Sequence, residues 1–212
     1  MLHFTLDKIL SLEKRYRASF INSVLGFKSL CLVGTKNTLG ESNLAVFNSF
    51  FHLGAHPPLI GFIIRPDTVE RTNLNKSWET TTLTSNHGTE AFDKKAHQTS
   101  ARYPSDASEF DEVGLKEELK EGFSAPFVKD SSIKIALQFR EKIDIEINGT
   151  IMIIGEIQDI YLPEEILKKD GYVDLIEAGS LTNNGLDSYH KVEKLDRLSY
   201  AKTDKPLISI EL

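Results

Sequence analysis

The sequence predicts a mainly β protein, a mostly antiparallel Greek-key barrel with a few short peripheral helices. The strongest observation is a pair of long segments, 133–147 and 150–161, in which apolar residues alternate with polar ones. This period is typical of barrel strands that bury one face. Asn148-Gly149 joins the two segments and is a dipeptide favoured in type I′ hairpin turns. No internal repeat or low-complexity segment is visible, so we expect a single domain over 1–212, with the barrel core at about 15–203.

The N-terminal half predicts a helical lead-in followed by three strands. Residues 6–26 place Leu6, Ile9, Leu10 and Leu12 on one side of a helix. The strands are expected at about 29–35, 42–51 and 59–64. Asn37 and Gly40 suit a hairpin loop after the first strand, and 54–58 breaks the chain before the third.

The middle strand, 42–51, is unusual because Asn43, Asn48 and Ser49 interrupt its apolar residues. Such a strand can present backbone N–H groups and short polar side chains to a flat ligand rich in hydrogen-bonding groups. The alternative is an ordinary β-hairpin with polar residues on its solvent face.

Pro66 ends the third strand because proline cannot extend a ladder, and Asp67 or Thr68 can cap a short helix that runs to about Ser77. The N-terminus of such a helix, with Arg65 just before it, suits a phosphate. The alternative is that Thr68 is only a helix cap and Arg65 a surface charge.

The rest of the chain alternates short elements with loops. A threonine-rich strand is expected at 78–86 and a helix at 89–97, followed by a loop in which His97 either caps the helix or contacts a ligand. Further expectations are helical turns at 109–113 and 116–119, a short helix at 164–169, a helix or strand at 172–179, a polar loop at 180–190 and an edge strand at 207–210.

Composition excludes several classes of function. The net charge is −6 and no long basic run occurs, so nucleic-acid binding is not expected. No apolar run of about 18 residues predicts a membrane helix. The ligand spacings of common metal sites and the glycine motifs of nucleotide cradles are absent. A charged N-terminus and a single cysteine, Cys31, favour the cytoplasm.

Three blocks of residues, in order along about 15–203, resemble the flavin reductase-like family of FMN-binding split β-barrels. The first block consists of Gly34-Thr35, Gly40, Asn43-Leu44-Ala45, Ser49-Phe50-Phe51, Pro57-Pro58-Leu59 and Asp67-Thr68. The second runs from Ala96 through Pro104, followed by Glu109-Phe110, Gly114-Leu115 and the proline of Ala125-Pro126. The third runs from Gly185 through His190, with Arg197-Leu198 after it. The chain departs from the family at 25–29, where relatives have a proline-rich entry into the first strand, so no role is assigned to those residues.

The resemblance implies an NAD(P)H:flavin oxidoreductase that passes a hydride from NAD(P)H to FMN. It implies a homodimer whose second subunit could complete the site through the third block, and an oxygenase or another electron acceptor as partner. His97 is the implied catalytic residue. The implied cofactor-binding residues are Asn43, Leu44, Ala45, Val46, Phe47, Asn48, Ser49, Arg65, Thr68, Asn86, His97, Thr99, Ser100 and Ala101.

Two alternatives remain open from the sequence. The chain could be an FMN-binding electron carrier that a protein partner reduces, or a barrel that has lost flavin and serves as a binding module. Tyr189 in the third block either stacks near the flavin or packs on the barrel with its hydroxyl in water.

Overall fold

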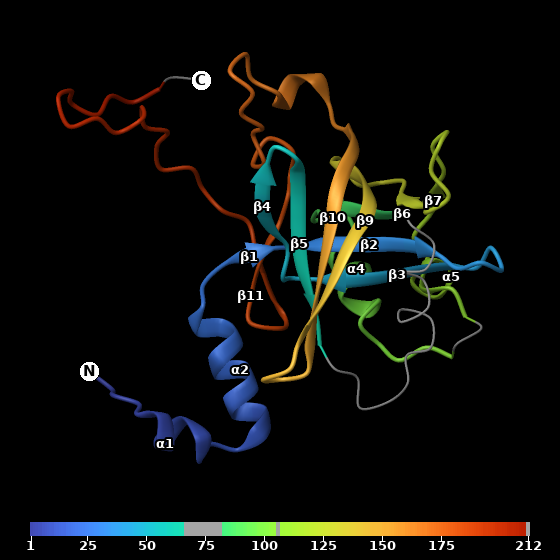
Figure 1. Cartoon of the computed structure of the whole chain (residues 1–212), viewed down its shortest axis with the longest axis horizontal. Helices are drawn as coiled ribbons and strands as arrows, with labels where there is room; N and C mark the ends of the chain where they lie inside the picture. Colours follow the sequence, from blue (N-terminus) through green and yellow to red (C-terminus); the bar gives the residue numbers. More distant parts are fainter. Residues whose placement is uncertain (66–81, 105–106, 211–212) are drawn as a thin grey trace.

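A seven-stranded antiparallel sheet forms the body of the protein (Figure 1), in a computed structural model that describes residues 1–65, 82–104 and 107–210. Its strand order is β3-β2-β6-β9-β10-β5-β4. The prediction of a mainly β, antiparallel fold is confirmed. The strands of this sheet are β2 (Cys31–Lys36), β3 (Ser42–Phe47), β4 (Phe51–Ala55), β5 (Pro58–Ile64), β6 (Thr82–His87), β9 (Lys134–Ile145) and β10 (Thr150–Tyr161).

Two smaller sheets accompany it. One joins β1 (Lys28–Ser29), β11 (Thr182–Asn184) and β12 (Ser188–His190) in the order β1-β11-β12. The other pairs β7 (Glu117–Glu118) with β8 (Phe127–Val128). The polar segment 180–190, expected as a loop, is therefore a short hairpin, and the helical turn expected at 116–119 is the strand β7.

The long alternating segments form the hairpin β9–β10, as predicted, but its turn is not of type I′. That turn needs a positive φ at both central residues. Here Gly149 has a φ of 72° and no non-glycine residue among those described has a positive φ. The Gly149 N–H donates to the Ile145 carbonyl at 2.9 Å, which closes a four-residue loop.

The sheet curls around an apolar interior made by side chains that are at most 1% exposed: Val33, Phe62, Leu83, Leu137 and Ile153. The single strand expected at 42–51 is wrong, because the chain leaves the sheet after Phe47 and re-enters it at Phe51. The Ser49 hydroxyl accepts the Ile63 N–H and donates to the Ile63 carbonyl, each at 3.0 Å, so a side chain replaces ladder bonds at this corner.

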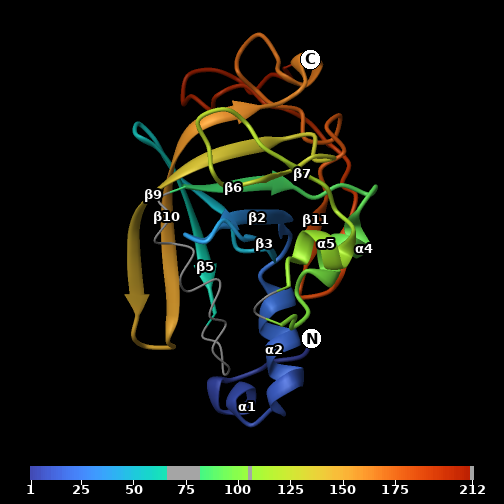
Figure 2. The same cartoon turned by 90° about the vertical axis from the view of Figure 1, so that its right-hand side faces the viewer.

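A second apolar cluster lies on the outer face of β2 and β3, under the short helices α4 (Asp93–Gln98) and α5 (Glu109–Val113). Leu32 and Leu44 meet Ala96 and Phe110 there. Figure 2 shows both helices beside β2 and β3. This cluster anchors the second family block against the first.

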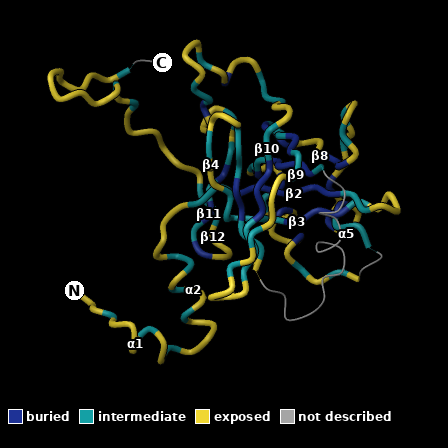
Figure 3. The backbone as a smooth tube through the Cα atoms, in the orientation of Figure 1, coloured by how far each residue is buried: buried dark blue, intermediate teal, exposed yellow. Residues whose placement is uncertain are grey.

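The predicted lead-in helix is two helices, α1 (Leu6–Leu10) and α2 (Lys14–Val24), because the Glu13 carboxylate caps α2 by accepting the N–H groups of Arg15 and Tyr16. Neither helix buries a residue, and the chain beyond His190 is also largely exposed (Figure 3).

The remaining expectations are met in part. The helix expected at 164–169 is only the 3-10 turn η1 (Glu164–Ile166), and 172–179 forms turns. The terminal edge strand reduces to one bridge between Leu198 and Ser209. The helix expected at 67–77, with Thr68, and the start of the threonine-rich strand lie outside the described residues.

Candidate functional site

The predicted cofactor strand β3 divides its side chains between two faces. Ala45 pairs with Val33, which lies in the barrel interior, so Asn43, Ala45 and Phe47 face inward. Leu44 packs outward against the helices, and Val46 follows on that side of the strand. The seven residues Asn43 to Ser49 therefore cannot all offer side chains to one ligand.

β3 is an edge of the sheet, so the backbone N–H and C=O groups of alternate residues point away from β2. The Leu44 N–H points off this edge and donates to Glu109 Oε2 at 3.2 Å. Backbone groups of alternate residues in an antiparallel strand point the same way. The N–H and C=O of Val46 therefore also point off this edge, away from β2. This edge can hydrogen-bond a flat polar molecule.

One polar atom of β3 is buried without a partner. Asn43 is 7% exposed, and its Oδ1 has no hydrogen bond within the described residues. The Thr35 hydroxyl, on the residue paired with Asn43, is also buried and unpaired. Because a buried unpaired polar group costs free energy, these atoms need explanation by something beyond the described contacts.

The side chains of Asn48 and Ser49 serve the fold. Asn48 Nδ2 donates to Asn183 Oδ1 at 3.0 Å and to the Gly185 carbonyl at 2.9 Å, which ties the end of β3 to the β11–β12 hairpin. The Ser49 hydroxyl closes the barrel corner on Ile63.

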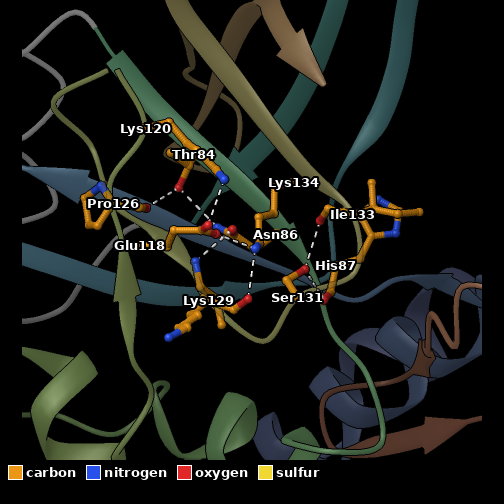
Figure 4. Close-up of polar contacts among 11 residues, drawn as sticks. Thr84, Asn86, His87, Glu118, Lys120, Pro126, Lys129, Ser131, Ile133 and Lys134 are labelled. Carbon is orange, nitrogen blue, oxygen red and sulfur yellow. Dashed lines mark hydrogen bonds and ion pairs between the residues drawn. The ribbon is translucent and has the colours of Figure 1, made fainter. Parts of the chain in front are cut away.

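Asn86 is fully buried, and its carboxamide is occupied by the protein (Figure 4). Its Nδ2 donates to the Leu32 carbonyl and to Thr84 Oγ1, each at 3.1 Å. Its Oδ1 accepts the Val128 N–H at 2.9 Å. Asn86 therefore lies beneath the part of the sheet that α4 and α5 cover, where its side chain joins β2, β6 and β8.

His97 lies in the last turn of α4 and is exposed, with Tyr189 of β12 beside it. His97 Nδ1 and the Tyr189 hydroxyl are 2.6 Å apart, and the rings meet edge to face at 5.7 Å. Burial raises the pKa of Tyr189, with a smaller contribution from Asp187. The tyrosine therefore remains a neutral partner that fixes the orientation of the imidazole.

The small residues after His97 finish the helix. Thr99 Oγ1 donates to the Ala96 carbonyl at 2.8 Å and Ser100 Oγ to the His97 carbonyl at 2.7 Å. Ala101, half-buried, follows them. Both hydroxyls are thus engaged by the end of α4, and this segment holds His97 in place.

Arg65 lies at the end of β5 and is exposed. Its Nη2 donates to Asn22 Oδ1 of α2 at 2.5 Å. Lys28 Nζ, half-buried on β1, donates to the Asn22 carbonyl at 2.8 Å. Burial and, next, the charge of Arg65 lower the pKa of Lys28. The sequence assigned no role to Lys28, because 25–29 departs from the family, and Asn22 lies outside the three family blocks.

The three family blocks meet at the sheet β1-β11-β12. Lys28, Asn183 and Tyr189 are register partners across β1, β11 and β12, so their side chains share one face. On that face, Asn183 contacts Asn48 and Tyr189 contacts His97. The third block of this chain therefore contacts the first two blocks of the same chain.

The family model described as "Flavin reductase like domain" matches residues 28–176, so the chain belongs to the flavin reductase-like family. Many solved structures are similar to this chain, among them three from Shewanella, Bacillus and Pseudomonas. A protein of Shewanella frigidimarina NCIMB 400, assigned as a flavin reductase with a split barrel domain, is 44% identical with a TM-score of 0.91, over 95% of this chain and 100% of its own.

The other two relatives are more distant and show the fold. Nitrilotriacetate monooxygenase component B from Bacillus cereus is 18% identical with a TM-score of 0.81, over 93% of this chain and 98% of its own. The 2-nitrobenzoate 2-nitroreductase of Pseudomonas fluorescens is 20% identical with a TM-score of 0.80, over 97% of this chain and 98% of its own.

Two features are absent from the part of the chain that the structure describes. No helix there is both long and apolar enough to cross a bilayer. Within the same residues, no three side chains of His, Cys, Asp or Glu gather as a metal site would require.

Proposed function

We propose that this protein is an NAD(P)H:flavin oxidoreductase that uses FMN and takes a hydride from NAD(P)H. The observation that carries the proposal is the meeting of the three blocks on one face of β1–β11–β12. The end of the edge strand β3 adjoins this face through Asn48 and Asn183, and the cation Arg65 and the His97–Tyr189 pair lie beside it. Family membership supports flavin chemistry, and the site supports its location.

The residues fit FMN. The outward backbone groups of β3 near Val46 would hydrogen-bond the flavin ring, and Arg65, with Thr68, would hold the phosphate. The buried, unpaired Asn43 Oδ1 supports a further polar partner at β3. FMN, when bound, supplies the redox chemistry, as cofactors do in such enzymes.

Most of the other predicted residues would support this site indirectly, by holding the surrounding structure in place. Asn48 orients the β11–β12 hairpin, Ser49 holds the barrel corner, and Asn86 supports the wall behind β3. Thr99 and Ser100 hold His97, whose free Nε2 would face the ligand while Nδ1 stays with Tyr189. We propose His97 as the residue that contacts the nicotinamide or flavin.

We further propose a cytoplasmic homodimer that passes electrons to an oxygenase or another acceptor. The relative named as component B of a monooxygenase supports an oxygenase partner. Unburied helices support a second copy, since α1 and α2 leave Leu10 and Tyr16 58% exposed and Val24 62% exposed.

The test is the absorbance spectrum of the purified protein before and after anaerobic NADH or NADPH. A flavin spectrum that bleaches supports the oxidoreductase. A bound flavin that stays oxidised refutes nicotinamide dependence and supports an electron carrier. A colourless protein that also fails to bind added FMN refutes both.

A further inference from the structure

Two cations, Lys28 and Arg65, lie near each other at one end of the sheet β1-β11-β12. Lys28 Nζ and the Arg65 guanidinium both hydrogen-bond Asn22, one at its carbonyl (2.8 Å) and the other at its Oδ1 (2.5 Å). No carboxylate in the described part of the chain pairs with either cation. The cluster therefore carries two positive charges on a shared neutral residue.

The end of α2 accounts for only part of this arrangement. A lysine that donates to a carbonyl in the last turn of a helix is a common stabilising contact. Arg65, however, donates to the Asn22 side chain and adds repulsion instead. The lowered pKa of Lys28 has burial and Arg65 as its causes, so the helix end does not offset the cost of holding Lys28 charged.

The position of Lys28 connects the cluster to the flavin site. Lys28 is the register partner of Asn183, which accepts a hydrogen bond from Asn48 at the end of β3. Tyr189 follows Asn183 in the same row and contacts His97. A dianion held between Lys28 and Arg65 would thus lie at the end of the face that we assign to FMN.

We propose that Lys28, together with Arg65, binds the phosphate monoester of the flavin and makes the protein select FMN over riboflavin. This inference rests on the proposed function in that it assumes flavin at this site. A phosphate dianion would offset the repulsion between the two cations and accept a charge-assisted hydrogen bond from each. One such bond corresponds to about a 10- to 100-fold change in affinity.

The experiment compares flavin affinities of four proteins by quenching of flavin fluorescence. They are the wild type, Lys28→Met, Lys28→Arg and the control Lys95→Met. Lys95 is a matched control because its Nζ also donates to a backbone carbonyl, that of Gly114 at 2.7 Å, and has no carboxylate partner among the described residues. Thermal melting of each protein confirms that it is folded.

We expect Lys28→Met to weaken FMN binding about 10- to 100-fold and to change riboflavin binding less than about twofold. Lys28→Arg should restore most of the FMN affinity, and Lys95→Met should leave both affinities unchanged. Equal losses for FMN and riboflavin would overturn the inference and reduce Lys28 to a support for α2. Unchanged FMN binding in Lys28→Met would overturn it as well.

A second arm separates the two sources of a phosphate monoester. NADPH carries a 2′-phosphate that NADH lacks. If Lys28→Met lowers affinity for NADPH relative to NADH but leaves FMN binding intact, the assignment to FMN is overturned. Failure of the proposed function gives a different result. If FMN binds but neither NADH nor NADPH reduces it, the oxidoreductase activity is refuted, and the ratio of FMN affinity to riboflavin affinity still measures the role of Lys28. A wild type that binds neither flavin overturns both.

Discussion

Replacing Asn86 with alanine should destabilise the fold, because its carboxamide makes three buried hydrogen bonds. The change removes the donor to the Leu32 carbonyl and Thr84 Oγ1 and leaves the Val128 N–H without its acceptor. Each bond contributes about 1 kcal/mol net, and the orphaned N–H adds about 1–2 kcal/mol. We expect a loss of about 4–5 kcal/mol, which lowers the melting temperature by about 8–20 °C for a chain of this length.

The assay is urea unfolding at pH 7, with Asn148→Ala as the control. Asn148 also accepts two hydrogen bonds, from the Thr150 N–H and hydroxyl, but it is exposed, so its loss should cost less than about 1 kcal/mol. An Asn86→Ala protein with wild-type stability that no longer binds FMN would refute this reasoning. It would show that the carboxamide serves the cofactor and not the wall.

Three other predictions concern groups in or beside the protein interior. Gly34→Ala should lower the free energy of unfolding in urea by about 2–3 kcal/mol, because the new Cβ would lie 2.1 Å from the Pro126 carbonyl oxygen. Gly54→Ala should be tolerated, because the nearest atom to its new Cβ is 3.5 Å away. Similar losses in the two variants would contradict this prediction. Burial lowers the pKa of His87 from 6.5 to about 4, so the unfolded chain takes up this proton first and stability falls as the pH drops from 6.5 toward 4, by up to about 3 kcal/mol. His87→Gln should flatten that dependence, and an unchanged slope in the variant would count against it. Burial raises the pKa of Cys31 to about 11, so a thiol reagent at pH 8 should label it in urea but not in the native protein, and rapid native labelling would disprove the assignment.

The sequence predicts what depends on neighbouring residues. The hairpin β9–β10 follows from apolar alternation over two twelve-residue strands, which needs no knowledge of distant contacts. The break between β3 and β4 does not follow, because it depends on the Ser49 hydroxyl bonding Ile63, 14 residues away. The type I′ expectation fails for a local reason, since the loop has four residues and keeps Asn148 at a negative φ.

The candidate site shows the same limit over a longer distance. Resemblance identifies the three blocks, but it cannot place them relative to one another. Their arrangement depends on the register of three very short strands and on contacts such as Asn48 with Asn183, 135 residues apart. Lys28 was therefore missed, because its two-residue strand has no sequence signal of its own.

The hydrogen bonds of the predicted polar residues separate structural from ligand-directed groups. The side chains of Asn86, Ser49, Thr99 and Ser100 have their bonds met by the protein. Asn43 Oδ1 has no partner among the described residues. Lys28 and Arg65 each donate a hydrogen bond, but only to the neutral Asn22, so the two positive charges have no carboxylate partner there. Because unpaired buried oxygens and adjacent like charges both cost stability, a folded chain that carries them is expected to recover that cost on binding. These groups, more than the residue types that the sequence singles out, are therefore those to vary first when the cofactor site is tested.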